Sequence, residues 1–213
     1  MRRPFLRAVP AAAVVVPVVA FVLAAIAAAE PAAPQQLAAE LGLGPQLAAV
    51  RAATERYRDV KVAIADGYVS EKACIALPGT GAMGVHFVHP KRMGLVMTDG
   101  RIDGTDTEID PTQPELLIYE PQRDGSLELV AVEYYTAQKA WGAGPRPTFY
   151  GVPFDAMQDD LATPDVDEGH GFTPHYDLHV CLYRENPRGT FAQWNPNVSC
   201  DAAPAGHAGH AGH

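Results

Sequence analysis

Serine and basic residues are scarce in this chain. Only Ser70, Ser126 and Ser199 occur among its 213 residues, and none lies in the G-x-S-x-G turn that presents a nucleophilic serine. The sequence therefore disfavours a serine hydrolase. Lysine and arginine number 16 against 25 aspartates and glutamates. This balance disfavours nucleic acids and anionic membranes as partners, because both need a positive field, and it favours metal ions or small ligands.

Cysteine is almost as rare, with Cys74, Cys181 and Cys200 making an odd set of three. In an oxidising compartment one of them has to stay unpaired. Cys74 and Cys200 lie at the edges of structured segments, whereas Cys181 falls inside an expected strand, where a free cysteine behaves as a small apolar residue. We therefore predict a Cys74–Cys200 disulfide, which joins the first third of the domain to its last ordered residues.

The first 29 residues have the pattern of an export signal peptide. Arginines at positions 2, 3 and 7 precede an apolar run, 11–29, which ends in small residues suited to cleavage before Glu30. Residues 2–7, RRPFLR, resemble the twin-arginine export motif; an ordinary Sec signal and an uncleaved membrane anchor are the alternatives. The sequence thus predicts an exported protein, periplasmic or extracellular, which meets a membrane only if the signal is uncleaved.

The rest of the chain predicts one α+β domain. Residues 30–45 are rich in proline and glycine and indicate a flexible lead, 46–200 the domain, and 201–213 a disordered tail. Apolar residues recur at spacings of three and four over 46–68, which is typical of an amphipathic helix. Later segments alternate with period two. We expect this N-terminal helix to pack on a mainly antiparallel β-sheet, with a small β-barrel as the alternative.

Three loop-like stretches superficially resemble sites. Residues 78–84, PGTGAMG, contain a G-x-G-x-x-G spacing, but no strand precedes it in this interpretation and the residues after it look extended, so a turn fits better than a dinucleotide site. Residues 98–114 form an acidic loop whose spacing does not match an EF-hand. Residues 155–168 are acidic as well and suggest a mobile surface flap that ends at His170.

The most informative stretch is HYDLHVCLY, residues 175–183. Its alternation predicts a strand with Tyr176, Leu178, Val180 and Leu182 on a core-facing side and His175, Asp177, His179, Cys181 and Tyr183 on the other. Same-face neighbours in a strand lie about 6.5–7 Å apart, a distance that Asp177 and His179 can close onto one metal ion. His175 and His179 lie about twice as far apart and should not share an ion directly.

Two further polar residues fall inside apolar strand patterns. In residues 83–90, Met83, Val85 and Phe87 share one face, which leaves His86 on the other and in the interior. Residues 116–119 and 127–136 read as a hairpin, and Glu133 shares a face there with Leu127, Leu129, Ala131 and Tyr135. A buried carboxylate is unfavourable unless a cation or a hydrogen-bond donor lies beside it.

These residues lead to a metal-site hypothesis. His86, Glu133 and His179 come from different strands, and two histidines with one carboxylate are the ligand set of many zinc and non-haem iron sites. His175 or Asp177 would act as a fourth ligand or support the others. A Zn, Cu or Fe ion is the expected cofactor. The alternative is a non-catalytic structural or ligand-binding module in which the same residues form a buried hydrogen-bonded network.

The C-terminal tail offers a separate source of ligands. Its AGHAGHAGH repeat places His207, His210 and His213 three residues apart, and repeated histidines favour capture of Zn, Cu or Ni ions. A tail without a selected function is the alternative. No catalytic residue is assigned, and the sequence favours binding over catalysis.

Several motifs together resemble a group of exported bacterial proteins of unknown function. They are GAMGVHFV, PELLIYEP, LVAVEYY, LHVCLYRENPRGTFAQWNP and the final VSC, and they extend over most of residues 55–200. In that group the position of Cys181 is usually tryptophan, so this chain departs from the pattern there. His86, Glu133 and His179 lie within the shared motifs, whereas His170, His175 and the tail histidines do not. The resemblance brings no activity with it.

Overall fold

The computed structural model describes residues 41–159, 167, 169–204 and 208–210. Its main feature is a seven-stranded sheet in the order β11-β1-β2-β5-β6-β10-β9. Neighbouring strands are antiparallel except for β11, which runs parallel to β1. The strands are β1 (Val69–Leu77), β2 (Gly81–Val88), β5 (Leu116–Pro121), β6 (Leu127–Ala137), β9 (Asp155–Met157), β10 (His175–Val180) and β11 (Ala208–His210).

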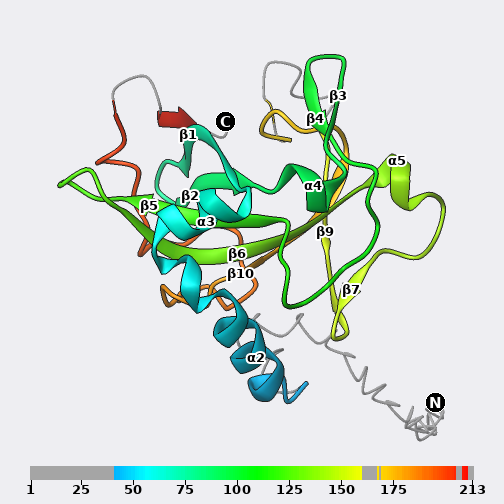
Figure 1. The fold of residues 1–213 in the computed structure, drawn as a ribbon, viewed down its shortest axis with the longest axis horizontal. Coiled ribbons are helices and arrows are strands. Elements are labelled where there is room, and N and C mark those ends of the chain that lie inside the picture. The colour runs from blue at the N-terminus through cyan, green and yellow to red at the C-terminus, as the bar shows by residue number, and fades with distance from the viewer. Residues whose placement is uncertain (1–40, 160–166, 168, 205–207, 211–213) are drawn as a thin grey trace, which may run out of the picture. The chain divides into compact units, whose positions relative to one another are not determined.

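This sheet confirms the predicted α+β class with a mainly antiparallel sheet. It is strongly curled in Figure 1. Within the described chain, its outermost strands β11 and β9 are not hydrogen-bonded to each other, so the sheet is open and the barrel alternative is not adopted. The strand β1 is an addition to the elements that the sequence predicts, because the sequence patterns indicate no element for residues 69–77.

The expected N-terminal helix is present, but it is divided into three parts: α2 (Gly44–Thr54), a 3₁₀ turn η1 (Glu55–Arg58) and α3 (Val60–Asp66). The break lies at Asp59, whose backbone is extended and whose side chain accepts the Lys61 N–H as an N-cap. Gly67 ends α3 in the left-handed conformation that favours glycine, with φ of 107°.

The remaining elements are short and flank the sheet. Two small hairpins pair β3 with β4 and β7 with β8, and the first of them lies partly within the acidic stretch that the sequence indicated as a loop. Two one-turn helices follow strands of the sheet, one after β2 and the other after β6. The bounds are α4 (Pro90–Met93), β3 (Val96–Thr98), β4 (Arg101–Asp103), α5 (Gln138–Trp141), β7 (Thr148–Phe149) and β8 (Val152–Pro153).

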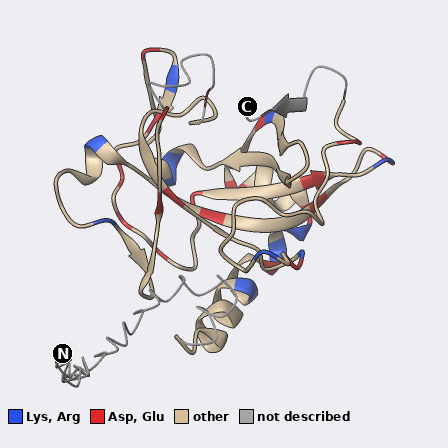
Figure 2. Ribbon diagram, turned by 180° about the vertical axis from the view of Figure 1, so that it is seen from behind, with Lys and Arg blue, Asp and Glu red and all other residues tan. Residues whose placement is uncertain are grey.

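The two faces of the sheet have different environments. One face packs under the N-terminal helices, and Figure 1 shows α3 in front of β5 and β6. This main core contains Leu178 and Val180 of β10, as the alternation predicted. The other face carries smaller apolar clusters and several buried polar residues. Figure 2 shows acidic residues within the strands of the sheet as well as in the loops.

Two β-bulges change which residues share a face. In the β5–β6 pairing, Ile118 lies opposite Ala131 and Tyr119 opposite Leu129, so Val130 is an extra residue. Leu129 therefore faces the main core, while Ala131 faces the opposite side with Glu133. The sequence interpretation that Leu127, Leu129 and Glu133 share one face was wrong for this reason.

The second bulge lies at Met83 in β2. Ile75 of β1 pairs with Gly84 and Ala76 pairs with Ala82, so Met83 has no partner of its own. Met83 consequently packs beside Ile75, away from the main core that holds Val85 and Phe87. This places Met83 and His86 on the same side of the sheet.

The predicted disulfide is confirmed. Cys74 of β1 is bonded to Cys200, with their Cα atoms 5.7 Å apart and a sequence separation of 126. Cys181 is the remaining free thiol. It lies just after the end of β10, half-buried, and accepts a hydrogen bond from the Asn186 amide. Burial raises the pKa of its thiol to about 11.

Several sequence predictions fall outside the described residues. They concern the signal peptide 1–29, most of the lead 30–45, the flap residues 160–166 and 168, and the side chains of His207, His210 and His213. The backbone of 208–210 forms β11. Within the described part of the chain, no helix has the length and apolar character needed to cross a membrane.

Candidate metal centre

Three adjacent parts of the sheet bring the predicted metal ligands together. His179 on β10 lies directly opposite Glu133 on β6, and His86 on β2 approaches from across β5, where its register partner is Ile118. All three side chains project from the face opposite the main core. The β6 bulge matters here because it leaves Glu133 on the same side as His86 and His179.

The distances are those of a compact cluster. The Glu133 Oε2 atom lies 3.4 Å from His86 Nε2 and 3.7 Å from His179 Nε2. Each residue offers one ligand atom, and these atoms all lie within 4.8 Å of one another. The two imidazole rings stand nearly perpendicular, with centroids 6.0 Å apart. Ligand atoms about 2 Å from a shared ion are separated by distances of this order.

The polar atoms of this cluster are buried, and several of them have no hydrogen-bond partner. His86, Glu133 and His179 are exposed by only 5%, 4% and 2%. Both ring nitrogens of His179 and the Oε2 atom of Glu133 have no hydrogen-bond partner. Buried polar groups are normally hydrogen-bonded, and an unpaired one is unfavourable by roughly 1–3 kcal/mol. A bound cation would satisfy the Glu133 oxygen and one nitrogen of His179 together.

Asp177 supports the cluster from beside it. Its carboxyl shares a hydrogen bond with Glu133, and Gln193 Nε2 donates to its Oδ1 at 3.3 Å. A bond between two carboxyls requires one proton, so one of the two is neutral. Asp177 therefore contacts Glu133, whereas the sequence had suggested that it joins His179 on the ion.

His175 also lines the cavity of this site but is not part of the compact ligand set. Its Nδ1–H donates to the Thr173 carbonyl at 2.8 Å, which leaves Nε2 as the acceptor nitrogen, 3.9 Å from Asp177 Oδ2. The ring packs against Tyr135 and Phe172. His175 and His179 do not share the compact ligand set, as their spacing along the strand predicted.

The protonation states follow from burial. Burial lowers the pKa of His86 to about 3 and of His175 to about 4, and it also lowers the pKa of His179. Burial and the neighbouring Asp177 raise the pKa of Glu133, and burial raises that of Asp177 to about 7. At neutral pH the imidazoles are therefore neutral, which is the form that ligates metals.

The site is nearly closed. His86, Glu133 and His179 line a cavity of about 10 Å³, which is room for about one water molecule or ion. Gly169, His170 and Phe172 cover it from outside the sheet, and Trp194 packs edge-on against His170. Three protein ligands leave a fourth coordination position, and the small cavity has no space at that position for more than a water molecule.

No protein-family model, curated protein or solved structure matches this chain. What the site binds therefore has to follow from its residues. The sequence identified all three members of the cluster, because each was a polar residue within an apolar strand pattern. It missed Met83, Tyr135 and His170 as cavity residues. The alternation correctly predicts that Tyr135 shares a face with Glu133, whereas Met83 reaches the cavity only because of the bulge in β2.

Proposed function

We propose that this protein is an exported metal-binding protein that holds one Zn, Cu or Fe ion between His86, Glu133 and His179. The observation that carries this proposal is the buried Glu133 oxygen, which lies within 4 Å of both histidines and has no hydrogen-bond donor. Two imidazoles and a carboxylate suit these ions. Asp177 would orient Glu133 through their hydrogen bond, because residues that hydrogen-bond to metal ligands commonly fix the orientation of those ligands.

The enclosure of the site supports retention of an ion more than turnover of a substrate. An ion bound here fills the small cavity and leaves no room for an organic molecule beside it. The role we propose is thus structural or storage binding, with no catalytic step. A buried network without metal is the competing function, and it is the outcome supported if the titration described below shows no uptake.

The proposed export rests on independent features. The Cys74–Cys200 disulfide is typical of oxidising compartments, and the first 29 residues have the signal pattern described above. The twin-arginine route exports proteins that have already folded, often with cofactors in place, so it would suit a chain that acquires its metal before export. Membership of the group of exported bacterial proteins stays a prediction. Metal capture by His207, His210 and His213 also stays a prediction.

Metal binding should release a proton and so depend on pH. The metal-free Glu133 holds its proton because its pKa is raised, while both imidazoles are already neutral. Lowering the pH favours protonated Glu133, so we expect the apparent zinc affinity to fall as the solution is made more acidic, by up to about tenfold per pH unit. Calorimetric titrations with zinc in buffers of different ionisation enthalpy measure both the stoichiometry and the protons released.

One zinc ion per chain with about one proton released supports the proposal. A control variant carries His207→Ser, His210→Ser and His213→Ser. Its zinc affinity and stoichiometry should match those of the wild-type chain, because the core site is intact. An affinity independent of pH, or uptake lost in the serine variant, contradicts a core site.

A further inference from the structure

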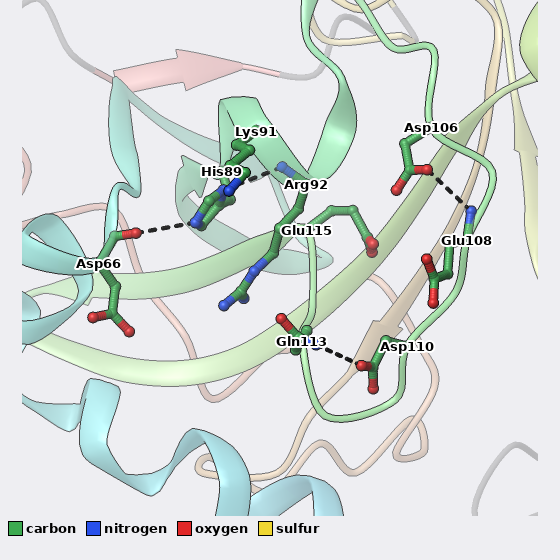
Figure 3. A pocket seen from close by; sticks show the side chains of 9 residues that line it. All are labelled: Asp66, His89, Lys91, Arg92, Asp106, Glu108, Asp110, Gln113 and Glu115. Carbon is green, nitrogen blue, oxygen red and sulfur yellow. Dashed lines mark hydrogen bonds between the residues drawn. The ribbon is translucent and has the colours of Figure 1, made fainter.

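A second cavity, of about 420 Å³, lies apart from the metal centre and shares no lining residue with it. Figure 3 shows it between the end of α3, the helix α4 and the loop 104–115. Its volume is within the range of small-molecule sites, roughly 300–1,000 Å³. Unlike most such sites, its lining is dominated by charged side chains of both signs.

Part of the lining is already satisfied by the protein itself. Asp110 accepts hydrogen bonds from Thr112 and Gln113. Asp66 accepts from Arg56 and Tyr57 through its carboxylate, and its backbone carbonyl accepts from His89 Nε2. These groups form the walls and have little capacity left for a ligand.

Arg92, on one wall, is only partly satisfied by the protein, because its side-chain hydrogen bonds to the described residues all come from Nη1. Its Nη1 donates to Tyr68 Oη at 2.5 Å and to the Pro114 carbonyl at 3.1 Å, and its guanidinium lies 5.2 Å from the Tyr68 ring centroid. Among the described residues, no carboxylate lies within ion-pair distance of it. Figure 3 shows the guanidinium extended into the cavity region between Asp66 and Gln113.

Carboxyl groups without a cation occupy the other side. Glu115 is only 3% exposed, and its Oε2 accepts the Tyr135 N–H at 3.2 Å. Figure 3 shows its carboxyl directed away from Arg92, toward the side where Asp106 and Glu108 lie. None of these three acids forms an ion pair with a described lysine or arginine. Burial raises the pKa of Glu115 to about 8.

A cation and several acids thus face one cavity without pairing. Arg92 is tied to Tyr68 and Pro114, and Glu115 to β6, so the backbone keeps them apart. A metal ion alone does not fit, because no three ligand atoms of the described lining converge within 4.8 Å. A simple anion would meet Arg92 but be repelled by the acids. A molecule with a carboxylate at one end and amines at the other complements both sides.

We propose that this cavity binds a basic amino acid of the lysine type, with its carboxylate on Arg92 and its amino groups on Glu108 and Asp106, while the buried Glu115 carboxyl accepts a hydrogen bond from one of these amino groups. The lining holds more acids than bases, so a ligand with a net positive charge fits better than a neutral amino acid. The exposed Lys91 is the second basic residue of the lining besides Arg92.

Isothermal titration calorimetry with L-lysine tests the proposal on the intact chain, in the presence of a chelator so that the metal centre plays no part. We expect saturable one-to-one binding, and weaker binding of 1,5-diaminopentane, which lacks the carboxylate. Arg92→Met should weaken L-lysine binding by about tenfold to a hundredfold and should not weaken binding of 1,5-diaminopentane, which has no carboxylate to lose. Arg123→Met is the matched control, since Arg123 lies in the distant β5–β6 turn.

Glu108→Gln provides a second variant that does not disturb folding, because Glu108 is exposed on the loop. It should weaken both ligands by about tenfold, whereas Glu185→Gln, an exposed residue elsewhere, should weaken neither. No L-lysine binding up to about 10 mM, equal binding of the two ligands, or wild-type affinity in the Arg92 and Glu108 variants overturns the proposal. None of these results bears on zinc binding.

Discussion

Replacement of His179 by alanine is expected to lower zinc affinity by at least about a hundredfold. His179 supplies one of the three protein ligands of the proposed site. Mutation of a residue that only hydrogen-bonds to a metal ligand already weakens metal binding by roughly 10–100-fold, so loss of a ligand itself should weaken it at least as much. In the wild-type chain, zinc at about 1,000 times its Kd should stabilise the fold by about 4 kcal/mol, or about 8–16 °C in Tm for a domain of this size. At the same zinc concentration a hundredfold weaker affinity leaves about 1.4 kcal/mol of stabilisation, so the variant should lose at least about two thirds of this shift.

The control for this experiment is His89→Asn. His89 is also a buried histidine, but it caps α4 by accepting the Arg92 N–H, and asparagine can replace it there. Its zinc-induced shift in Tm should match that of the wild-type chain. A His179→Ala chain that retains the full zinc shift would show that the ion is bound elsewhere.

Removal of the Cys74–Cys200 disulfide should have the largest effect on stability. The bridge closes a loop of 126 residues, and the chain-entropy model gives about 5 kcal/mol for a loop of this length. The Cys74→Ala, Cys200→Ala double variant should unfold about 10–20 °C below the wild-type chain. Thermal unfolding followed by circular dichroism, with zinc removed, measures the difference.

Cys181→Ala is the matched control for the disulfide. It removes the free, half-buried thiol, and we expect a loss of about 1 kcal/mol or less. If the double variant unfolds at the same temperature as this control, the disulfide does not stabilise the folded protein in the way described.

The fold was predictable wherever a single local pattern decides the structure. The period-two alternation of residues 175–183 gave β10 and its two faces, and the apolar runs around Asp124 and Gly125 gave the β5–β6 hairpin. The strand β1 was missed because its sequence, VSEKACIAL, lacks strict alternation of apolar and polar residues. The helix break at Asp59 was missed because apolar spacings of three continue through the 3₁₀ turn.

The candidate site was predictable as a set of residues but not as a geometry. His86, Glu133 and His179 stood out because polar residues interrupt apolar strands. The bulge at Val130 decides which way Glu133 faces relative to Leu129, and a period-two pattern carries no signal for one inserted residue. The charged cavity depends on how loop 104–115 folds back over α4, which no local pattern specifies.

X-ray absorption spectroscopy at the zinc edge tests the central claim most directly. The sample is the one-to-one zinc complex of the variant with serine at positions 207, 210 and 213. Coordination by His86, Glu133 and His179 predicts two imidazole nitrogens and at least one oxygen, all about 2.0–2.2 Å from the ion. A chain that takes up no zinc, or a spectrum without imidazole ligands, would contradict a metal centre inside this sheet.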